Sequence, residues 1–124
     1  LLCALLNIRS EKALLQSPSA GAVWETFVFA QLRDRERRAG RSGSLFFWRD
    51  RTREVDFVID TGGRLELFEA KWTEIPDAGD TGNLEFARNL VGKWRVIGGG
   101  VISRTPNSFP FPNGFRALPV TELG

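Results

Sequence analysis

The sequence contains no histidine, no tyrosine and no methionine, and it has one cysteine among its 124 residues. Without histidine, a Ser-His-Asp triad, imidazole general-base catalysis and a histidine-ligated metal are all excluded. The single Cys3 cannot form an internal disulfide or a cysteine-rich zinc site. The catalytic chemistry left to the chain is that of carboxylates, lysine and a metal ion.

Further absences bear on location and domain organisation. The Gly92-Lys93 pair lacks the upstream glycine and the following serine or threonine of a phosphate-binding P-loop. No apolar run approaches the roughly 20 residues that span a bilayer, and no signal peptide is recognisable. We therefore expect a cytoplasmic protein with no membrane contact. Since the chain has no initiator methionine and begins abruptly at Leu1, we expect it to be the C-terminal part of a longer protein.

What is present fits an ordered domain with a real core. The chain is 42% hydrophobic and holds four tryptophans and ten phenylalanines. We expect residues 1–16 to be the end of a preceding helical region and residues 17–124 to form a single domain.

The order of elements predicts an α/β fold. Ser17-Pro18-Ser19 is a helix start that tolerates proline in the first turn, and the helix is expected over residues 20–38. Its first half is apolar on most sides, which predicts a buried helix. The other expected elements are a strand at 44–48, strands at 54–60 and 64–72, a loop at 75–82, a helix at 83–91, a strand at 93–98, a flexible glycine run at 98–100, a loop at 103–114 and a final edge strand at 115–120.

Two neighbouring strands carry the most informative residues. Asp56 lies in the first, and Glu69 and Lys71 lie in the second, after a short glycine turn. Because side chains alternate along a strand, Glu69 and Lys71 project from one face. If residues 61–64 close a hairpin, Asp56 joins them. An aspartate, a glutamate and a lysine so placed form an oxygen-rich site for Mg²⁺ with a cation beside it.

The alternative is a solvated or merely salt-bridged sheet face, because one outward glutamate and one outward lysine are common on strands. The neighbours of Asp56 argue against it, since Val55, Phe57, Val58 and Ile59 otherwise form a buried strand. A carboxylate in such a strand needs a partner, because burying an unpaired charge is costly. We therefore favour a clustered acidic site.

Glu25 is a further candidate, on the first helix. It shares a helical stripe with Phe29 and Leu32, which follow it at four and seven positions. A carboxylate there is unlike the usual solvent-facing glutamate. It would reach the metal cluster, or bond to a backbone amide or an arginine, and the sequence does not separate these possibilities.

The charge of the chain is uneven. Residues 1–53 hold ten Lys/Arg and five Asp/Glu, and residues 54–124 hold seven and ten, so the halves carry +5 and −3. A basic patch beside an acidic cluster suits a phosphodiester substrate. A salt-bridged, solubilising helix end is the alternative, because Asp34 and Glu36 interleave with the arginines. The candidate nucleic-acid-binding residues are Arg33, Arg35, Arg37, Arg38, Arg49, Arg51 and Arg53.

The spacing D-x12-E-x-K resembles the signature of the PD-(D/E)XK phosphodiesterase superfamily, whose fold is called restriction-endonuclease-like. The expected order αβββαβ, a mixed sheet flanked by helices, is the order of that core. The resemblance implies that Glu25, Asp56, Glu69 and Lys71 are catalytic. It also implies Mg²⁺ held by Asp56, Glu69 and Glu25 and by the backbone carbonyl of Ala70.

The chain also resembles the C-terminal domain of unknown function of prokaryotic AAA-type ATP-binding proteins. This resemblance implies an upstream ATPase domain in the same chain, which alone would bind ATP. We therefore expect a magnesium-dependent nucleic-acid phosphodiesterase, and as the alternative a catalytically silent interaction or regulatory module of the ATPase. The matching segments are 21–28, 45–50, 54–59, 68–72 and 117–120.

Overall fold

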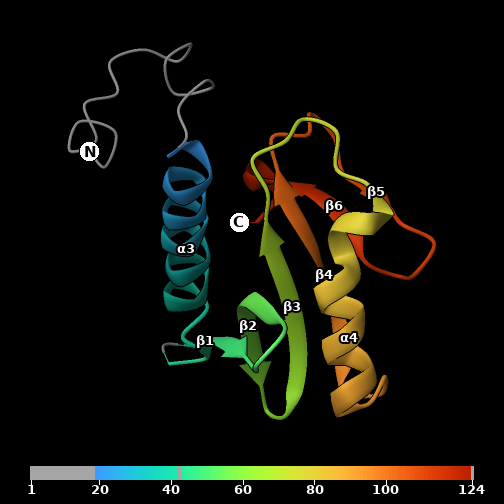
Figure 1. Ribbon diagram of the computed structural model, residues 1–124. Helices are drawn as coiled ribbons and strands as arrows, with labels where there is room; N and C mark the ends of the chain where they lie inside the picture. The colour runs from blue at the N-terminus through green and yellow to red at the C-terminus, as the bar shows by residue number, and fades with distance from the viewer. Residues whose placement is uncertain (1–18, 42, 124) are drawn as a thin grey trace.

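The computed structural model describes residues 19–41 and 43–123 and shows one mixed six-stranded sheet with a helix on each face (Figure 1). The strand order is β1-β2-β3-β4-β6-β5. The elements are α3 (Ala20–Arg38), β1 (Leu45–Arg49), β2 (Glu54–Thr61), β3 (Arg64–Ala70), the 3-10 helix η1 (Ala78–Thr81), α4 (Gly82–Val91), β4 (Val96–Ser103), β5 (Phe109–Pro110), β6 (Arg116–Pro119) and the 3-10 helix η2 (Val120–Glu122).

The predicted hairpin of β2 and β3 is confirmed. The two strands pair antiparallel, from Phe57 opposite Phe68 to Thr61 opposite Arg64. The two turn residues between them, Gly62 and Gly63, have φ of 64° and 88°, a conformation that glycine adopts without steric cost. Strands β1 and β2 are also antiparallel, whereas β3, β4 and β6 run parallel to one another.

Helix α3 covers one face of the sheet through a stripe of residues four positions apart. Trp24, Val28 and Leu32 are buried in a core with side chains of β2, β3 and β4, and Trp24 Nε1 donates to the carbonyl of Ile102 at 3.0 Å. The prediction of a generally buried helix is wrong, because only this stripe faces the sheet. Phe27 and Phe29 lie on other faces of α3 and are exposed.

The C-terminal end of α3 is fixed by an ion cluster around Glu36. This carboxylate is 1% exposed and accepts bonds from Arg41 at 2.8 Å, Ser44 at 3.0 Å and Arg35 at 3.0 Å. The bond from Arg41 is the main reason why the pKa of Glu36 falls to about 2. Gly40, with φ of 76°, turns the chain out of the helix.

Helix α4 packs on the opposite face of the sheet from α3. Its buried residues Leu84 and Ala87 contact Leu65 and Leu67 of β3, whereas Phe68 of the same strand faces α3. Period-two alternation along β3 therefore separates two cores. The expected mixed sheet flanked by helices is present, and Figure 1 shows the sheet between the two helices.

The glycine run at 98–100 is the middle of strand β4, so its predicted flexibility is wrong. A Cβ on Gly99 would run into the backbone of Leu67 in β3, and one on Gly100 would run into the backbone of Arg116 in β6. These glycines are needed because the neighbouring strands approach too closely for a side chain.

Four smaller predictions also need correction. The strand at 93–98 begins only at Val96, because residues 92–95 form a turn in which Arg95 donates to the carbonyl of Gly92. The loops at 75–82 and 103–114 contain η1 and β5, respectively. The strand at 115–120 is not the edge, because the short β5 pairs with the outer side of β6.

Candidate functional site

A β-bulge in β2 positions Asp56. Phe46 pairs with Val58, but Trp48 pairs with Val55, so one residue of β1 spans two residues of β2. Val55 then packs in the core under α4, while Phe57 packs in the core under α3. Asp56 lies between them, half-buried, at the change of face.

The pairing of β2 with β3 brings Asp56 against Glu69 of β3. Continuing the β2–β3 register by one pair places these two residues opposite each other. Asp56 Oδ2 accepts a hydrogen bond from the Ala70 amide at 3.0 Å, and its carboxylate lies close enough to that of Glu69 to raise the pKa of Glu69. The two carboxylates that the sequence singles out are therefore in contact.

Glu69 is held in an unusual electrostatic environment. Its side chain is 6% exposed, and burial raises its pKa to about 9, with the hydrogen bond and the charge of Asp56 adding to the effect. Lys71 and Asn83 act in the opposite direction but do not outweigh burial. Among the described residues no partner bonds to its buried Oε1. Buried polar atoms are nearly always bonded, so an oxygen without a protein donor at this position is unusual.

Lys71 follows the last residue of β3 and is exposed. Its amide donates to the carbonyl of Ile102 at 3.0 Å, which keeps it aligned with β4. Its ammonium acts on the carboxylate of Glu69 and lowers that pKa. The E-x-K pair therefore lies together at the end of β3, with the lysine open to solvent.

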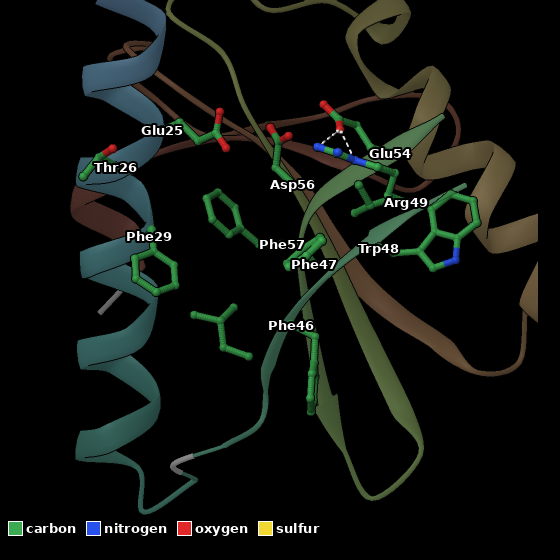
Figure 2. Close-up of a pocket in the computed structure, with 12 residues that line it drawn as sticks. Glu25, Thr26, Phe29, Phe46, Phe47, Trp48, Arg49, Glu54, Asp56 and Phe57 are labelled. Atoms are coloured by element: carbon green, nitrogen blue, oxygen red, sulfur yellow. Dashed lines mark hydrogen bonds and ion pairs between the residues drawn. The ribbon is translucent and has the colours of Figure 1, made fainter. Parts of the chain in front are cut away.

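Glu25 approaches the pair from α3. Figure 2 shows its carboxylate turned toward Asp56 across the pocket. Partial burial raises its pKa, and the charges of Asp56 and Glu54 raise it further. Within residues 19–41 and 43–123, however, no three Asp, Glu, Cys or His side chains lie close enough to hold one metal ion together. Glu25 therefore flanks the Asp56–Glu69 pair and does not complete a carboxylate triad.

A pocket of about 420 Å³ opens beside Asp56, between α3 and the edge strand β1 (Figure 2). We call it the aromatic pocket. Its wall includes four phenylalanines and one tryptophan, and its rim is charged. Its lining residues are Glu25, Thr26, Phe29, Leu45, Phe46, Phe47, Trp48, Arg49, Glu54, Val55, Asp56 and Phe57.

Sequence reasoning missed the aromatic pocket and Asn83. Phe46 and Phe47 read as ordinary strand residues, and only the placement of β1 at the sheet edge exposes them. Asn83 lies in the first turn of α4, where a short polar residue is common and gives no functional signal. Its contact with Glu69 depends on how α4 packs on the sheet.

Three of the seven candidate phosphate-binding arginines form ion pairs within the protein. Arg35 contacts Glu36 and Glu66, Arg38 pairs with Asp34, and Arg49 pairs with Glu54. These contacts agree with the salt-bridged alternative for part of the basic patch.

The other four arginines differ from one another. Arg33 lies over the ring of Phe29 and Arg53 over that of Phe86. Arg37 and Arg51 are exposed. Arg49 is the member of the predicted set that lines the aromatic pocket.

The fold and the site together define an α/β domain with a pair of neighbouring carboxylates, Asp56 half-buried and Glu69 buried, and an open aromatic pocket beside it. The chain belongs to the family described as domain of unknown function DUF4143, whose model matches residues 20–123. Within the described residues, no helix is long and apolar enough to cross a membrane.

Two curated proteins are similar to this chain. They are the uncharacterized proteins Mb2031c of Mycobacterium bovis and Rv2008c of Mycobacterium tuberculosis, each 36% identical over 77 residues. The match covers 61% of this chain and 17% of each relative, so the relatives are much longer proteins. No solved structure matches the chain.

Proposed function

We propose that this domain is a magnesium-dependent phosphodiesterase acting on nucleic acid. The observation that carries the proposal is the contact between Asp56 and Glu69, with Oε1 of Glu69 buried and without a bonding partner. Two carboxylates pressed together repel each other when both are ionised, so the pair is suited to a cation between them. The exposed ammonium of Lys71 lies beside it.

The residues fit a hard divalent cation. The carboxylates of Asp56 and Glu69 would hold it, together with the carbonyl of Ala70, whose amide already points to Asp56. A bound Mg²⁺ supplies polarisation of the phosphate and of a water molecule. Lys71 would orient that water and offset negative charge on the phosphate. Glu25 would bond to the water shell from α3.

The element order supports the same function. From α3 through β1, β2 and β3 to α4 and β4, the chain follows the αβββαβ order of the restriction-endonuclease-like core. The proposed catalytic positions also fall on the elements that this core uses. We propose that the domain works in the cytoplasm beside an upstream ATP-binding domain of the same chain.

A second candidate is an interaction or regulatory module of that ATPase, without catalysis. The ion pairs of Arg35, Arg38 and Arg49 favour it, because these arginines are less free to bind phosphates. Exposed ion pairs contribute only about 0–1 kcal/mol, so a polyanion could still compete for Arg38 and Arg49.

The test combines metal binding with cleavage. Calorimetric titration with Mg²⁺ should show one site in the original chain and none in Asp56→Asn, which loses a metal-binding charge. Lys71→Ala should keep metal binding and the fold, because Lys71 is exposed, but should abolish cleavage of labelled DNA and RNA. If the original chain cleaves no nucleic acid with Mg²⁺ or Mn²⁺, alone or with its ATPase, catalysis is wrong and the module function remains.

A further inference from the structure

The aromatic pocket exposes more phenylalanine surface than packing of this domain requires. Phe46 is 53% exposed and Phe47 is 75% exposed, and both belong to the edge strand β1. Phe29 of α3, which is 40% exposed, faces them from the other side of the pocket (Figure 2). Apolar surface gathered in a concave, charge-rimmed site is typical of a ligand-binding position.

We propose that the aromatic pocket binds one unpaired nucleobase, so that the substrate is single-stranded nucleic acid or a nucleotide turned out of a duplex. This inference rests on the proposed phosphodiesterase function and names the substrate class of the same site. Asp56 links the two, because it lines the pocket and also contacts Glu69. A base in the pocket places its own phosphodiester beside the carboxylate pair.

The shape and chemistry of the wall suit a flat heterocycle. The pocket volume of about 420 Å³ is enough for one nucleotide. Phe29 packs against Phe57, with 6.3 Å between ring centres and an angle of 25°, and Arg33 lies 5.4 Å from its centre. These contacts restrict the Phe29 ring, while the more exposed Phe46 and Phe47 offer free aromatic surface on which a base can stack.

The rim of the pocket favours a base over a purely apolar ligand. Glu25, Glu54 and Asp56 present carboxylate oxygens, and Arg49 presents a guanidinium that bonds to Glu54 at 3.0 Å. Exocyclic amino groups of bases donate to carboxylates, and base carbonyls accept from arginine. An alkyl chain would cover these charges without bonding to them, at a cost in desolvation.

The same geometry excludes an intact duplex from the pocket. A paired base is stacked on both sides and bonded on its Watson–Crick edge, so it must leave the helix before it can enter a pocket. Arginines such as Arg37 and Arg51 are expected to contact phosphates and not bases. Such contacts would not distinguish a single strand from a duplex.

The test measures binding without cleavage. Fluorescence anisotropy of a labelled 12-nucleotide DNA strand is recorded with the original chain in EDTA at low salt, for an all-base strand, a strand with three central abasic sites, and a duplex. We expect the all-base strand to bind about tenfold more tightly than the abasic strand and the duplex. Phe47→Ala should remove most of this difference. Trp94→Ala is the matched control, because Trp94 is exposed but lies outside the pocket.

Equal binding of the all-base and abasic strands would overturn the inference, as would no effect of Phe47→Ala. Sedimentation is measured for both chains. If the original chain is a dimer and Phe47→Ala is a monomer, the inference is also overturned, and the surface is a contact with a second copy of the chain. Cleavage with Mg²⁺ is assayed on the same strands. Cleavage without base-dependent binding would contradict only the base-binding inference. Base-dependent binding without cleavage would contradict only the proposed phosphodiesterase function.

Discussion

Asp56 Oδ2 lies 3.0 Å from the amide nitrogen of Ala70, so a side chain of β2 bonds to the backbone of β3 just beyond their last paired residues. The same carboxylate meets Glu69, the residue before Ala70. The aspartate is thus fixed by a backbone donor, while burial, reinforced by the aspartate, raises the pKa of the glutamate.

The stability of the metal-free protein should depend on Glu69. Its folded pKa of about 9 exceeds the ordinary value of 4.5, so between these pH values the folded chain keeps a proton that the unfolded chain releases. The free energy of unfolding should therefore fall as pH rises from 5 to 9. Urea unfolding in EDTA measures this slope, and no histidine in the chain adds to it.

Glu69→Gln is the decisive variant for this pH dependence. Glutamine has nearly the same shape as glutamate and does not titrate. The free energy of unfolding of Glu69→Gln should therefore change much less between pH 5 and pH 9 than that of the original chain. An equal slope in Glu69→Gln and the original chain would mean that another group causes it.

Glu36→Ala should lower the free energy of unfolding by about 3 kcal/mol at pH 7, because it leaves Arg35, Arg41 and Ser44 without their shared partner. Asp34→Ala is the control, since its exposed pair with Arg38 should be worth less than about 1 kcal/mol. Chemical denaturation measures both. Similar losses in the two variants would contradict the buried cluster.

Glu36 also predicts a loss of stability in acid. Its folded pKa of about 2 is below the ordinary 4.5, so its contribution is complete above pH 4.5 and is lost as pH falls toward 2. Glu36→Ala should remove that part of the acid sensitivity.

Gly99→Ala should destabilise the protein by at least about 3 kcal/mol, because the new Cβ meets the backbone of Leu67 and the residue has φ of 125°. Gly21→Ala should instead stabilise it by about 0.5–1 kcal/mol, since nothing lies within 4 Å of a Cβ at this helical position. Thermal unfolding compares the pair. A tolerated Gly99→Ala would show that β3 and β4 can move apart.

Arg35→Ala and Arg37→Ala should behave differently although they are two residues apart. Arg35 bonds to Glu36 and Glu66, so its loss should reduce stability. Arg37 is exposed, so its loss should leave stability unchanged and weaken nucleic-acid binding with a smaller salt dependence. Binding titrations at two salt concentrations measure this, and unchanged binding by Arg37→Ala would remove this arginine from the interface.

Local signals were enough for the first half of the fold. The bounds of α3 agree with the predicted 20–38, because Ser19 and Gly40 mark its ends, and the glycine turn fixes the β2–β3 hairpin. The adjacency of Asp56 and Glu69 follows from strand alternation once that hairpin is known.

Long-range packing decided what the sequence did not reveal. Gly99 and Gly100 weaken a strand locally, yet the spacing of three strands requires them in the middle of β4. The apolar residues of α3 do not show which of them a sheet will cover, so the exposure of Phe29 was unforeseen. The side of the sheet that α4 covers is equally a property of the whole fold.

The bulge at Asp56 makes the site depend on chain length as well as on residue type. On the side of Phe46 and Val58, β1 and β2 follow one pairing frame. On the side of Trp48 and Val55 they follow another, which differs by one residue. Adding one residue to β1 opposite Asp56 would merge the frames and give Asp56 the simple alternation of its neighbours, facing one core only. Every residue type of the site would then be retained, but the carboxylate would no longer lie between the aromatic pocket and Glu69.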